Sequence, residues 1–143
     1  MSTDKMRYID LPGFGPPEAM QVAEGPLPVV GPADVLIQVA YAGVNRPDVA
    51  QRMGRYNPPP GASPVMGLEA SGAVVSVGKH VRQWKPGDEV CALTPGGGYA
   101  EYVGVPAAHC LPIPQGLGLL QAGALPENFF TVWVNAFDML KLR

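Results

Sequence analysis

The sequence is poor in charge. Charged residues make up 15% of the 143 residues and the net charge is −2, whereas typical soluble domains contain roughly 25% charged residues. No block of Lys and Arg occurs, so the sequence offers no electrostatic basis for binding nucleic acid or an anionic membrane surface. We therefore expect neither nucleic acid nor a membrane as a partner.

Long apolar runs and cysteine-rich motifs are missing as well. No segment reaches the roughly 18 consecutive apolar residues of a membrane span, and the N-terminal residues lack the apolar core of a secretory signal. The two cysteines, Cys91 and Cys110, form no CxxC pair. Their spacing leaves a disulfide open, but two reduced, buried thiols are favoured in a chain without a signal. These absences predict a cytoplasmic protein.

Metal and nucleotide motifs are also absent. The two histidines, His80 and His109, are not spaced with the cysteines as zinc ligands. The glycine-rich stretches 96–98 and 116–123 lack the strand–GxGxxG–helix context of a dinucleotide-binding fingerprint. We therefore expect no metal site and no phosphate cradle among these residues.

The sequence is rich in glycine and proline, with 18 and 17 residues. They separate short apolar segments, a pattern typical of many short strands and turns. Residues 34–41 alternate as a strand with four side chains on one face: Val35, Ile37, Val39 and Tyr41. Further strands are predicted at 70–77, 88–93 and 99–105, the last two paired as a hairpin. This spacing predicts a mainly β fold, a small barrel or sandwich with short helices.

Residues 125–143 have the pattern of a long helix with two apolar faces. One face carries Phe130, Trp133, Val134 and Phe137, and the other carries Phe129, Val132 and Ala136. A helix that is apolar on both sides is buried on both sides, and little chain remains to bury this one. We expect the helix to continue beyond Arg143 and the chain to be a fragment whose remaining residues cover it.

One stretch, 43–57, gathers polar side chains around a short helical pattern. Pro47 suits the first helical position. Helix capping accounts for Asn45 and Asp48, and Tyr56 is compatible with a half-buried aromatic at a turn. A functional site is the alternative, and the residues by themselves leave both interpretations open.

Five segments form a recognisable series along the chain: GVNRPD (43–48), GRYNPPPGASPVMGLEASGAVVSVG (54–78), WKPGDEV (84–90), PGGGYAEYV (95–103) and ALPENFFTVW (124–133). The series resembles the N-terminal half of medium-chain dehydrogenases/reductases, and within them the zinc-free, zeta-crystallin-like quinone oxidoreductases. The resemblance implies a GroES-like β-barrel catalytic domain over residues 1–124. It also implies that residues 125–143 begin a helix leading into a Rossmann domain that this chain lacks.

The resemblance further implies a site without metal. Zinc-dependent relatives have a cysteine ligand where this chain has Asn45, and a histidine ligand where it has Leu68. The cysteine-rich lobe of a structural zinc, expected after Val90, is missing. The implied chemistry is hydride transfer from NADPH or NADH to a small-molecule quinone or a similar electrophilic carbonyl, without Lewis-acid zinc.

Residue roles follow from the same resemblance. Asn45 and Tyr56 are implied as catalytic residues that also bind substrate, together with Asp48. Tyr56 would donate a hydrogen bond to the carbonyl oxygen that gains charge during hydride transfer. Asn45, Thr131 and Glu127 are implied to contact the cofactor, which the absent Rossmann domain would hold for the most part. A homodimer is expected for the full-length protein.

Two other functions remain open. An enoyl-thioester or other α,β-unsaturated carbonyl reductase of the same fold would use a tyrosine near Tyr56 as the proton donor. A non-enzymatic GroES-like binding module is the second alternative, and the apolar pattern of residues 125–143 argues against it.

Overall fold

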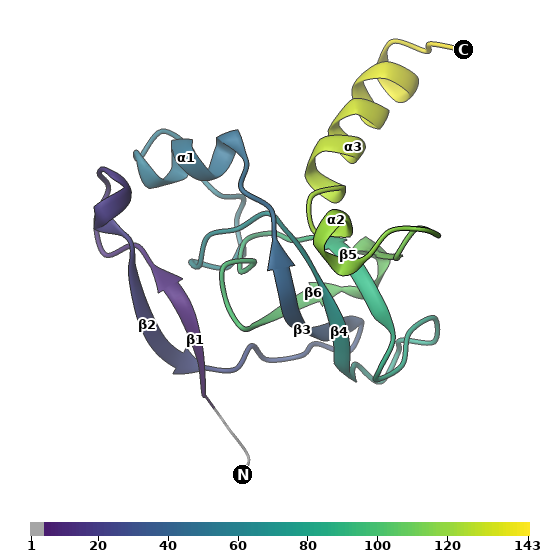
Figure 1. Ribbon diagram of the computed structural model, residues 1–143, viewed down its shortest axis with the longest axis horizontal. Helices are drawn as coiled ribbons and strands as arrows, with labels where there is room; N and C mark the ends of the chain where they lie inside the picture. Colours follow the sequence, from purple (N-terminus) through teal and green to yellow (C-terminus); the bar gives the residue numbers. More distant parts are fainter. Residues whose placement is uncertain (1–4) are drawn as a thin grey trace.

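The computed structural model describes residues 5–143, and its strands form two antiparallel sheets (Figure 1). One sheet is a hairpin of β1 (Lys5–Asp10) and β2 (Gln21–Pro26). The other has five strands in the order β6-β3-β4-β5-β7. These are β3 (Asp34–Ala42), β4 (Glu69–Val77), β5 (Glu89–Leu93), β6 (Tyr102–Pro106) and β7 (Cys110–Pro112).

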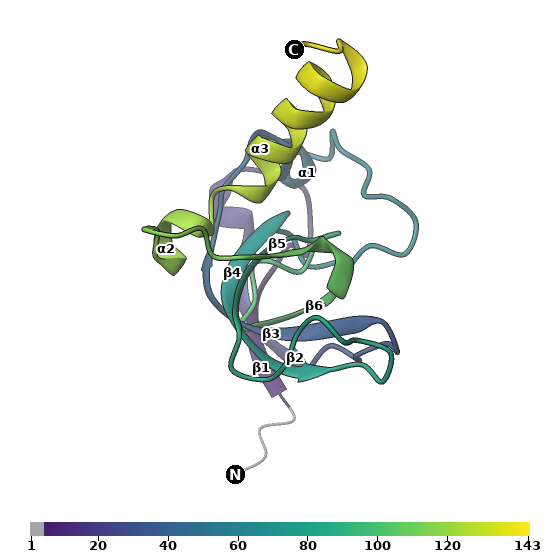
Figure 2. The same ribbon diagram turned by 90° about the vertical axis from the view of Figure 1, so that its right-hand side faces the viewer.

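Short helices connect and flank the strands. They are the 3₁₀-helices η1 (Pro17–Ala19) and η2 (Ala107–His109), the α-helices α1 (Arg46–Arg52), α2 (Leu119–Ala122) and α3 (Pro126–Trp133), and the π-helix η3 (Val134–Met139). Figure 2 shows the five-stranded sheet as a curved layer, with α3 and η3 extending away from it. The helices therefore lie at one end of a β structure.

The apolar core lies inside the curved sheet. Its largest members come from β3, β4, β5 and β6: Val35, Ile37, Val74, Val90, Val103 and Val105. A bridge between Tyr8 and Ala100, and a 2.8 Å hydrogen bond from the Ile9 N–H to the Tyr99 carbonyl, join the hairpin to the segment before β6. The two sheets thus form a partly open barrel, which confirms the predicted mainly β fold with short helices.

The predicted hairpin of 88–93 with 99–105 is wrong. β6 pairs with β3, and β5 lies between β4 and β7. The intervening glycines carry the chain across the barrel instead of turning it back. Gly96 and Gly97 have positive φ angles of 82° and 92°, and the Gly97 N–H donates to the Val65 carbonyl at 2.7 Å. Only glycine adopts these angles freely, and the segment then packs against residues 63–65.

The prediction that alternate side chains of residues 34–41 share one face is confirmed only in part. β3 begins as expected, with Val35 and Ile37 inside the barrel. A register shift against β4 falls between Val39 and Tyr41, and such a bulge changes the face that the following side chains occupy. Tyr41 is 46% exposed, so it does not continue the core face as predicted.

The C-terminal helix differs from its prediction in length and burial. α3 ends at Trp133, a π-helix follows to Met139, and Lys141 has a positive φ angle of 55°, so the helix does not run off the end of the chain. Its apolar side chains are not covered by the described residues. Phe129 and Trp133 are 63% and 60% exposed. The burial of both faces was expected from residues that this chain lacks, so it stays a prediction, and residues 5–143 place no other element over this helix.

Both thiols are free and buried, as predicted. Burial raises the pKa of Cys110 to about 12, with a further increase from the neighbouring Cys91. Burial also raises the pKa of Cys91, and the negative charge of Glu69 adds to that effect. Both thiols are therefore protonated, structural side chains at neutral pH.

Candidate functional site

The predicted polar cluster forms around the start of α1. Asn45 occupies the N-cap position, and Pro47 lies in the first helical turn, as expected. One oxygen of the Asp48 carboxylate accepts a hydrogen bond from the Asn45 backbone N–H at 2.8 Å. This reciprocal contact is the capping role foreseen for Asp48. Asp48 is only 2% exposed, so its carboxylate lies inside the molecule and not on a solvated surface.

The Asn45 side chain has another partner. Its amide nitrogen Nδ2 donates to Oε1 of Glu69, at the start of β4, at 2.8 Å. The other oxygen of Glu69 accepts from the backbone N–H of Glu127 in the first turn of α3, at 3.0 Å. Asn128 Nδ2 approaches Asn45 Oδ1 at 3.4 Å. Asn45, Glu69 and the first turn of α3 therefore form one hydrogen-bonded group, which we call the Glu69 cluster.

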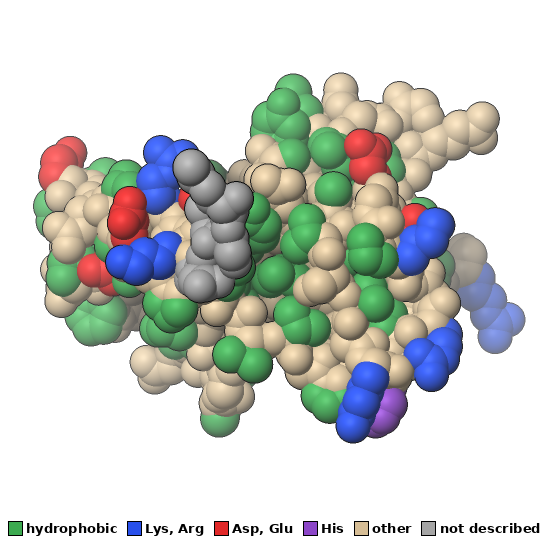
Figure 3. All heavy atoms as spheres, turned by 90° about the horizontal axis from the view of Figure 1, so that it is seen from below, with side chains coloured by type: hydrophobic (Ala, Val, Ile, Leu, Met, Phe, Trp, Pro, Cys, Tyr) green, Lys and Arg blue, Asp and Glu red, His purple; other side chains and the backbone are tan. Residues whose placement is uncertain are grey.

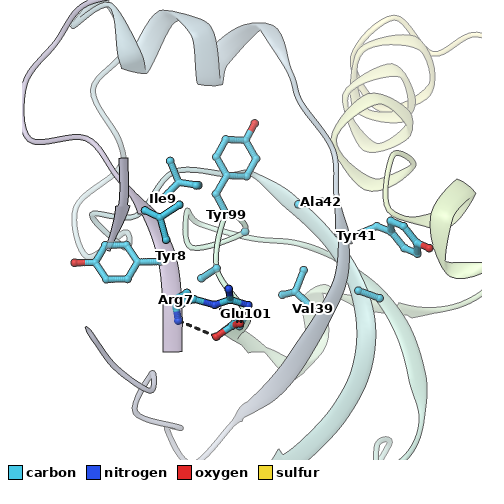
Figure 4. Close-up of a pocket in the computed structure, with 12 residues that line it drawn as sticks. Arg7, Tyr8, Ile9, Val39, Tyr41, Ala42, Tyr99 and Glu101 are labelled. Carbon is cyan, nitrogen blue, oxygen red and sulfur yellow. Dashed lines mark hydrogen bonds and ion pairs between the residues drawn. The ribbon is translucent and has the colours of Figure 1, made fainter. Parts of the chain in front are cut away.

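A second pair of polar side chains, Tyr99 and Asp48, lies between the barrel and α1. Figure 4 shows the Tyr99 hydroxyl directed toward the side where α1 lies. Burial raises the pKa of Tyr99, and the negative charge of Asp48 is the next largest cause. Tyr99 and Asp48 also line one small cavity of about 110 Å³ between α1 and the barrel. The hydroxyl of Tyr99 is therefore kept protonated beside the buried carboxylate.

Tyr56 lies apart from Asn45, in a separate hollow. This hollow of about 250 Å³ is lined by Tyr56, Glu127 and His109, and otherwise mostly by apolar side chains: Pro59, Leu68, Leu93, Thr94 and Pro95. The structure thus brings Tyr56 and Glu127 together at one surface. Asn45 and Asp48 are not among its lining residues, although Leu68 and Glu127 connect the hollow directly to the Glu69 cluster.

The two predicted residues of α3 differ in environment. Glu127 is partly buried, and its pKa is raised above the usual carboxyl value by burial first and then by the negative charges of Glu69 and Asp48. Thr131 lies one turn further along and is exposed. Its carbonyl oxygen accepts from Asn135 Nδ2 at 2.7 Å. Thr131 is therefore accessible on this helix within residues 5–143.

A wider hollow of about 360 Å³ lies between β1 and β3 and contains none of the predicted site residues. The Arg7–Glu101 ion pair of 2.6 Å lies within it (Figure 4). Seen from below, the molecule presents apolar side chains around the middle, with Lys, Arg, Asp and Glu scattered towards the edges (Figure 3). This hollow shares only Tyr99 with the cavity beside α1 and carries no second cluster of reactive groups.

Two properties of the described residues bear on metal and membrane binding. Among residues 5–143, no group of three or more His, Cys, Asp or Glu side chains is placed to hold a metal ion. In the same part of the chain, no helix combines the length and the apolar character needed to cross a bilayer.

Two residues of the site were not predicted. Glu69 could have been suspected, because a lone acid inside the buried strand pattern GLEASG needs polar partners. His109 was considered only as a zinc ligand, which its spacing argues against, and it lies at the hollow of Tyr56. No signal in the sequence pairs positions 56 and 109, since they are distant in the chain and meet only in the folded barrel.

The fold and the site together define a small antiparallel β domain of the GroES-like class, with its polar cluster between the barrel and the C-terminal helix. Residues 31–115 match the alcohol dehydrogenase GroES-like domain. The chain belongs to this family.

Relatives of known name support the same class. The chain is 34% identical over 140 residues to a synaptic vesicle membrane protein VAT-1 homolog of Rattus norvegicus. The matched region covers 96% of this chain and 35% of that protein. It is 34% identical over 140 residues to a quinone oxidoreductase of Mus musculus, covering 96% of this chain and 42% of that protein. The chain therefore spans less than half the length of these relatives.

The solved structures agree with the sequence comparison. The crystal structure of human synaptic vesicle membrane protein VAT-1 homolog-like protein matches with a TM-score of 0.88 and 32% identity, covering 97% of this chain and 45% of that one. The resemblance to the N-terminal part of medium-chain dehydrogenases/reductases is thereby confirmed.

Proposed function

We propose that this chain is the catalytic-domain part of an NAD(P)H-dependent quinone oxidoreductase that works without zinc. The observation that carries the proposal is the placement of Tyr56 and Glu127 in one largely apolar hollow, directly beside the Glu69 cluster. An apolar hollow with a few convergent polar groups is the usual form of a small-molecule site. The similarity to a quinone oxidoreductase supports this reaction class.

The chemistry needs a bound acceptor and a proton. When bound, NAD(P)H supplies a hydride, and a quinone that receives it also needs one proton to become the hydroquinone. Tyr56 is proposed to donate a hydrogen bond to the quinone oxygen that gains negative charge, and such a donor typically contributes a few kcal/mol to the transition state. Glu127 lines the same hollow and has a raised carboxyl pKa. It is proposed to supply the proton that the reduced quinone needs.

The residues around α3 fit the polar edge of a nicotinamide cofactor. Asn45 Oδ1 lies 3.4 Å from Asn128 Nδ2, so this acceptor faces α3, and Thr131 is exposed on the same helix. Neither glycine-rich stretch of the sequence has the fingerprint that holds the phosphates of a dinucleotide. We therefore propose that a following nucleotide-binding domain holds most of the cofactor.

The same domain is proposed to cover α3 and η3. The relatives are more than twice as long as this chain, and the exposed apolar side chains of the helix are of the kind that interdomain contacts bury. We retain 1–124 and 125–143 as the boundaries of the catalytic domain and the linking helix. A homodimer of the full-length protein and a cytoplasmic location are part of the proposal.

The test uses the polypeptide encoded by the full gene. Purified protein is incubated with NADPH or NADH and either ortho-quinones or enoyl thioesters, and cofactor oxidation is followed by absorbance. We expect faster turnover with quinones and a loss of roughly a hundred- to a thousandfold in kcat for Tyr56→Phe, the scale of one lost transition-state donor. The Tyr102→Phe variant, altered outside this hollow, serves as the matched control.

Three outcomes would contradict the proposal. Faster turnover of enoyl thioesters would favour the unsaturated carbonyl reductase. A gene that ends at Arg143, with no glycine fingerprint downstream, would favour the non-enzymatic binding module. Unchanged kinetics for Tyr56→Phe would reduce Tyr56 to a packing residue.

A further inference from the structure

We propose that Glu69 is the positioning residue of this site, which holds the Asn45 side chain with one carboxylate oxygen and the first turn of α3 with the other. Glu69 reaches both through short hydrogen bonds of 2.8 Å and 3.0 Å. It thereby links the start of α1 to the start of α3, two segments far apart in the sequence. The catalytic consequence rests on the proposed function, whereas the geometric role does not.

The burial of Glu69 explains why this link is strong. The side chain is 1% exposed, and a buried carboxylate is stable only where hydrogen bonds and charge compensate for the lost water. Neither described ion pair includes Glu69. Its charge is opposed by the N-terminal end of α3, where free backbone N–H groups and the helix dipole favour an anion. Moving either helix away would leave the carboxylate uncompensated.

The link also decides which atom Asn45 presents. Glu69 Oε1 accepts its hydrogen bond from the Asn45 amide nitrogen at 2.8 Å, so the nitrogen of the amide faces Glu69. The carbonyl oxygen Oδ1 then points to the opposite side, toward Asn128 on α3. Asn45 consequently turns its acceptor oxygen toward the first turn of α3, and a ligand group that binds this oxygen must carry an N–H or O–H, as a carboxamide or a ribose hydroxyl does.

Gly43 completes the arrangement. A side-chain carbon added at this position would fall directly on Oε1 and the carboxyl carbon of Glu69. The absence of a side chain at Gly43 therefore leaves the room that the Glu69 carboxylate needs. Gly43→Ala displaces the carboxylate without removing it, which gives a second and independent way to disturb the link.

The first experiment measures position without relying on activity. Hydrogen exchange of the first turn of α3 is compared in the full polypeptide and in three variants: Glu69→Gln, Gly43→Ala and Ser71→Ala. Ser71 is the matched control, since it is fully buried on the same strand and its hydroxyl donates to the Leu119 carbonyl at 2.6 Å.

We expect roughly tenfold faster exchange in this turn for Glu69→Gln and Gly43→Ala, the scale of one lost bond to a charged acceptor. Ser71→Ala should leave this turn unchanged. Unchanged exchange in Glu69→Gln overturns the proposal. If that variant does not fold, Gly43→Ala decides in the same way, because it keeps the carboxylate.

The second experiment tests the link to Asn45 through a double-mutant cycle. Glu69→Gln is expected to lower kcat roughly tenfold with little change in KM for the quinone, and to have less than about a threefold effect when Asn45 is already Ala. Fully additive losses would overturn the positioning role. If the unmodified protein oxidises no cofactor with any quinone, the proposed function fails, while the exchange result still decides the geometric role.

Discussion

β3 and α3 both carry large apolar side chains, but Val35, Leu36 and Ile37 of β3 are buried, whereas most of those of α3 are exposed. Ile37 of β3 is 0% exposed, whereas Phe129 of α3 is 63% exposed. Trp133 and Phe137 pack chiefly against each other, with ring centroids 4.8 Å apart. An apolar residue stabilises a fold only where water is removed from it. The barrel thus accounts for the stability of this chain, and the helix carries an unused apolar surface.

The largest expected effect separates these two regions directly. Ile37→Ala should lower the free energy of unfolding by about 3 kcal/mol, because it leaves a cavity in the closed part of the core. Phe129→Ala should change it by less than about 0.5 kcal/mol, as is usual for exposed side chains. Urea denaturation of both variants gives the comparison. A loss for Phe129→Ala as large as that for Ile37→Ala would mean that α3 is packed in solution.

The two tryptophans report on the same contrast by fluorescence. Trp84 is half-buried and donates from its indole nitrogen to the Ala107 carbonyl at 3.0 Å, while Trp133 is 60% exposed. In the 143-residue chain, Trp84→Phe should leave emission that iodide quenches strongly, and Trp133→Phe should leave emission that is several-fold less quenched. A longer polypeptide that covers α3 should remove this difference. Equal quenching in the short chain would contradict the exposure of Trp133.

The Cys110 thiol, at the edge of the barrel core, should make the free energy of unfolding depend on pH, with an effect of intermediate size. Burial raises the pKa of Cys110 from 9.0 to about 12 in the folded chain, so the folded state keeps a proton that the unfolded state releases. The contribution of Cys110 is therefore complete below pH 9 and is lost as the pH rises toward 12.

The difference in unfolding free energy between the unmodified chain and Cys110→Ala should shrink by roughly 1 kcal/mol between pH 8 and pH 10. Chemical denaturation of both proteins across this pH range measures this difference in unfolding free energy. Other groups titrate equally in the two proteins, so their contributions cancel. A constant difference would show that the thiol is accessible to water.

The smallest expected effect concerns the junction between barrel and helix. Burial and the carboxylates of Glu69 and Asp48 raise the pKa of Glu127 above 4.5, so its ionised form is disfavoured in the folded state. Glu127→Gln should therefore stabilise the chain by about 0.5 kcal/mol at neutral pH, the scale of a screened charge contact. The gain should vanish as the pH falls below 4.5. Thermal unfolding at several pH values tests this, and Asp138→Gln, altered on the exposed part of η3, should show no such gain.

Much of the β fold could be predicted from local patterns. Alternation places Val35 and Ile37 inside the barrel, and the proline–glycine turn at 85–88 forms as its residues favour, with the Asp88 N–H donating to the Lys85 carbonyl at 3.1 Å. The pairing of β6 with β3 could not be predicted in this way. It depends on the path that Gly96 and Gly97 take across the barrel. This path is fixed by contacts with residues 63–65, about thirty residues earlier in the chain.

The arrangement of the proposed site residues could not be predicted from the sequence. Asn45 and Asp48 lie together at the start of α1, while Tyr56 lies in a separate hollow with Glu127 and His109. Only a resemblance to a family pointed to Thr131 and Glu127. The link through Glu69 escaped prediction, because an acid in a strand gives no indication of which helix it will meet.

The sequence by itself determined four strands of the larger sheet (β3, β4, β5 and β6), the turn at 85–88, the buried thiols and the short α1 helix, since these depend on the conformational preferences of neighbouring residues. Tertiary structure alone decided the strand order, the outward turn of Tyr41 and the exposure of α3. It also decided that the Asn45 amide faces Glu69. The physical reason is that segments distant in the sequence supply the hydrogen bonds that a buried carboxylate needs and the surfaces that cover apolar side chains. No local pattern indicates which distant segment this will be.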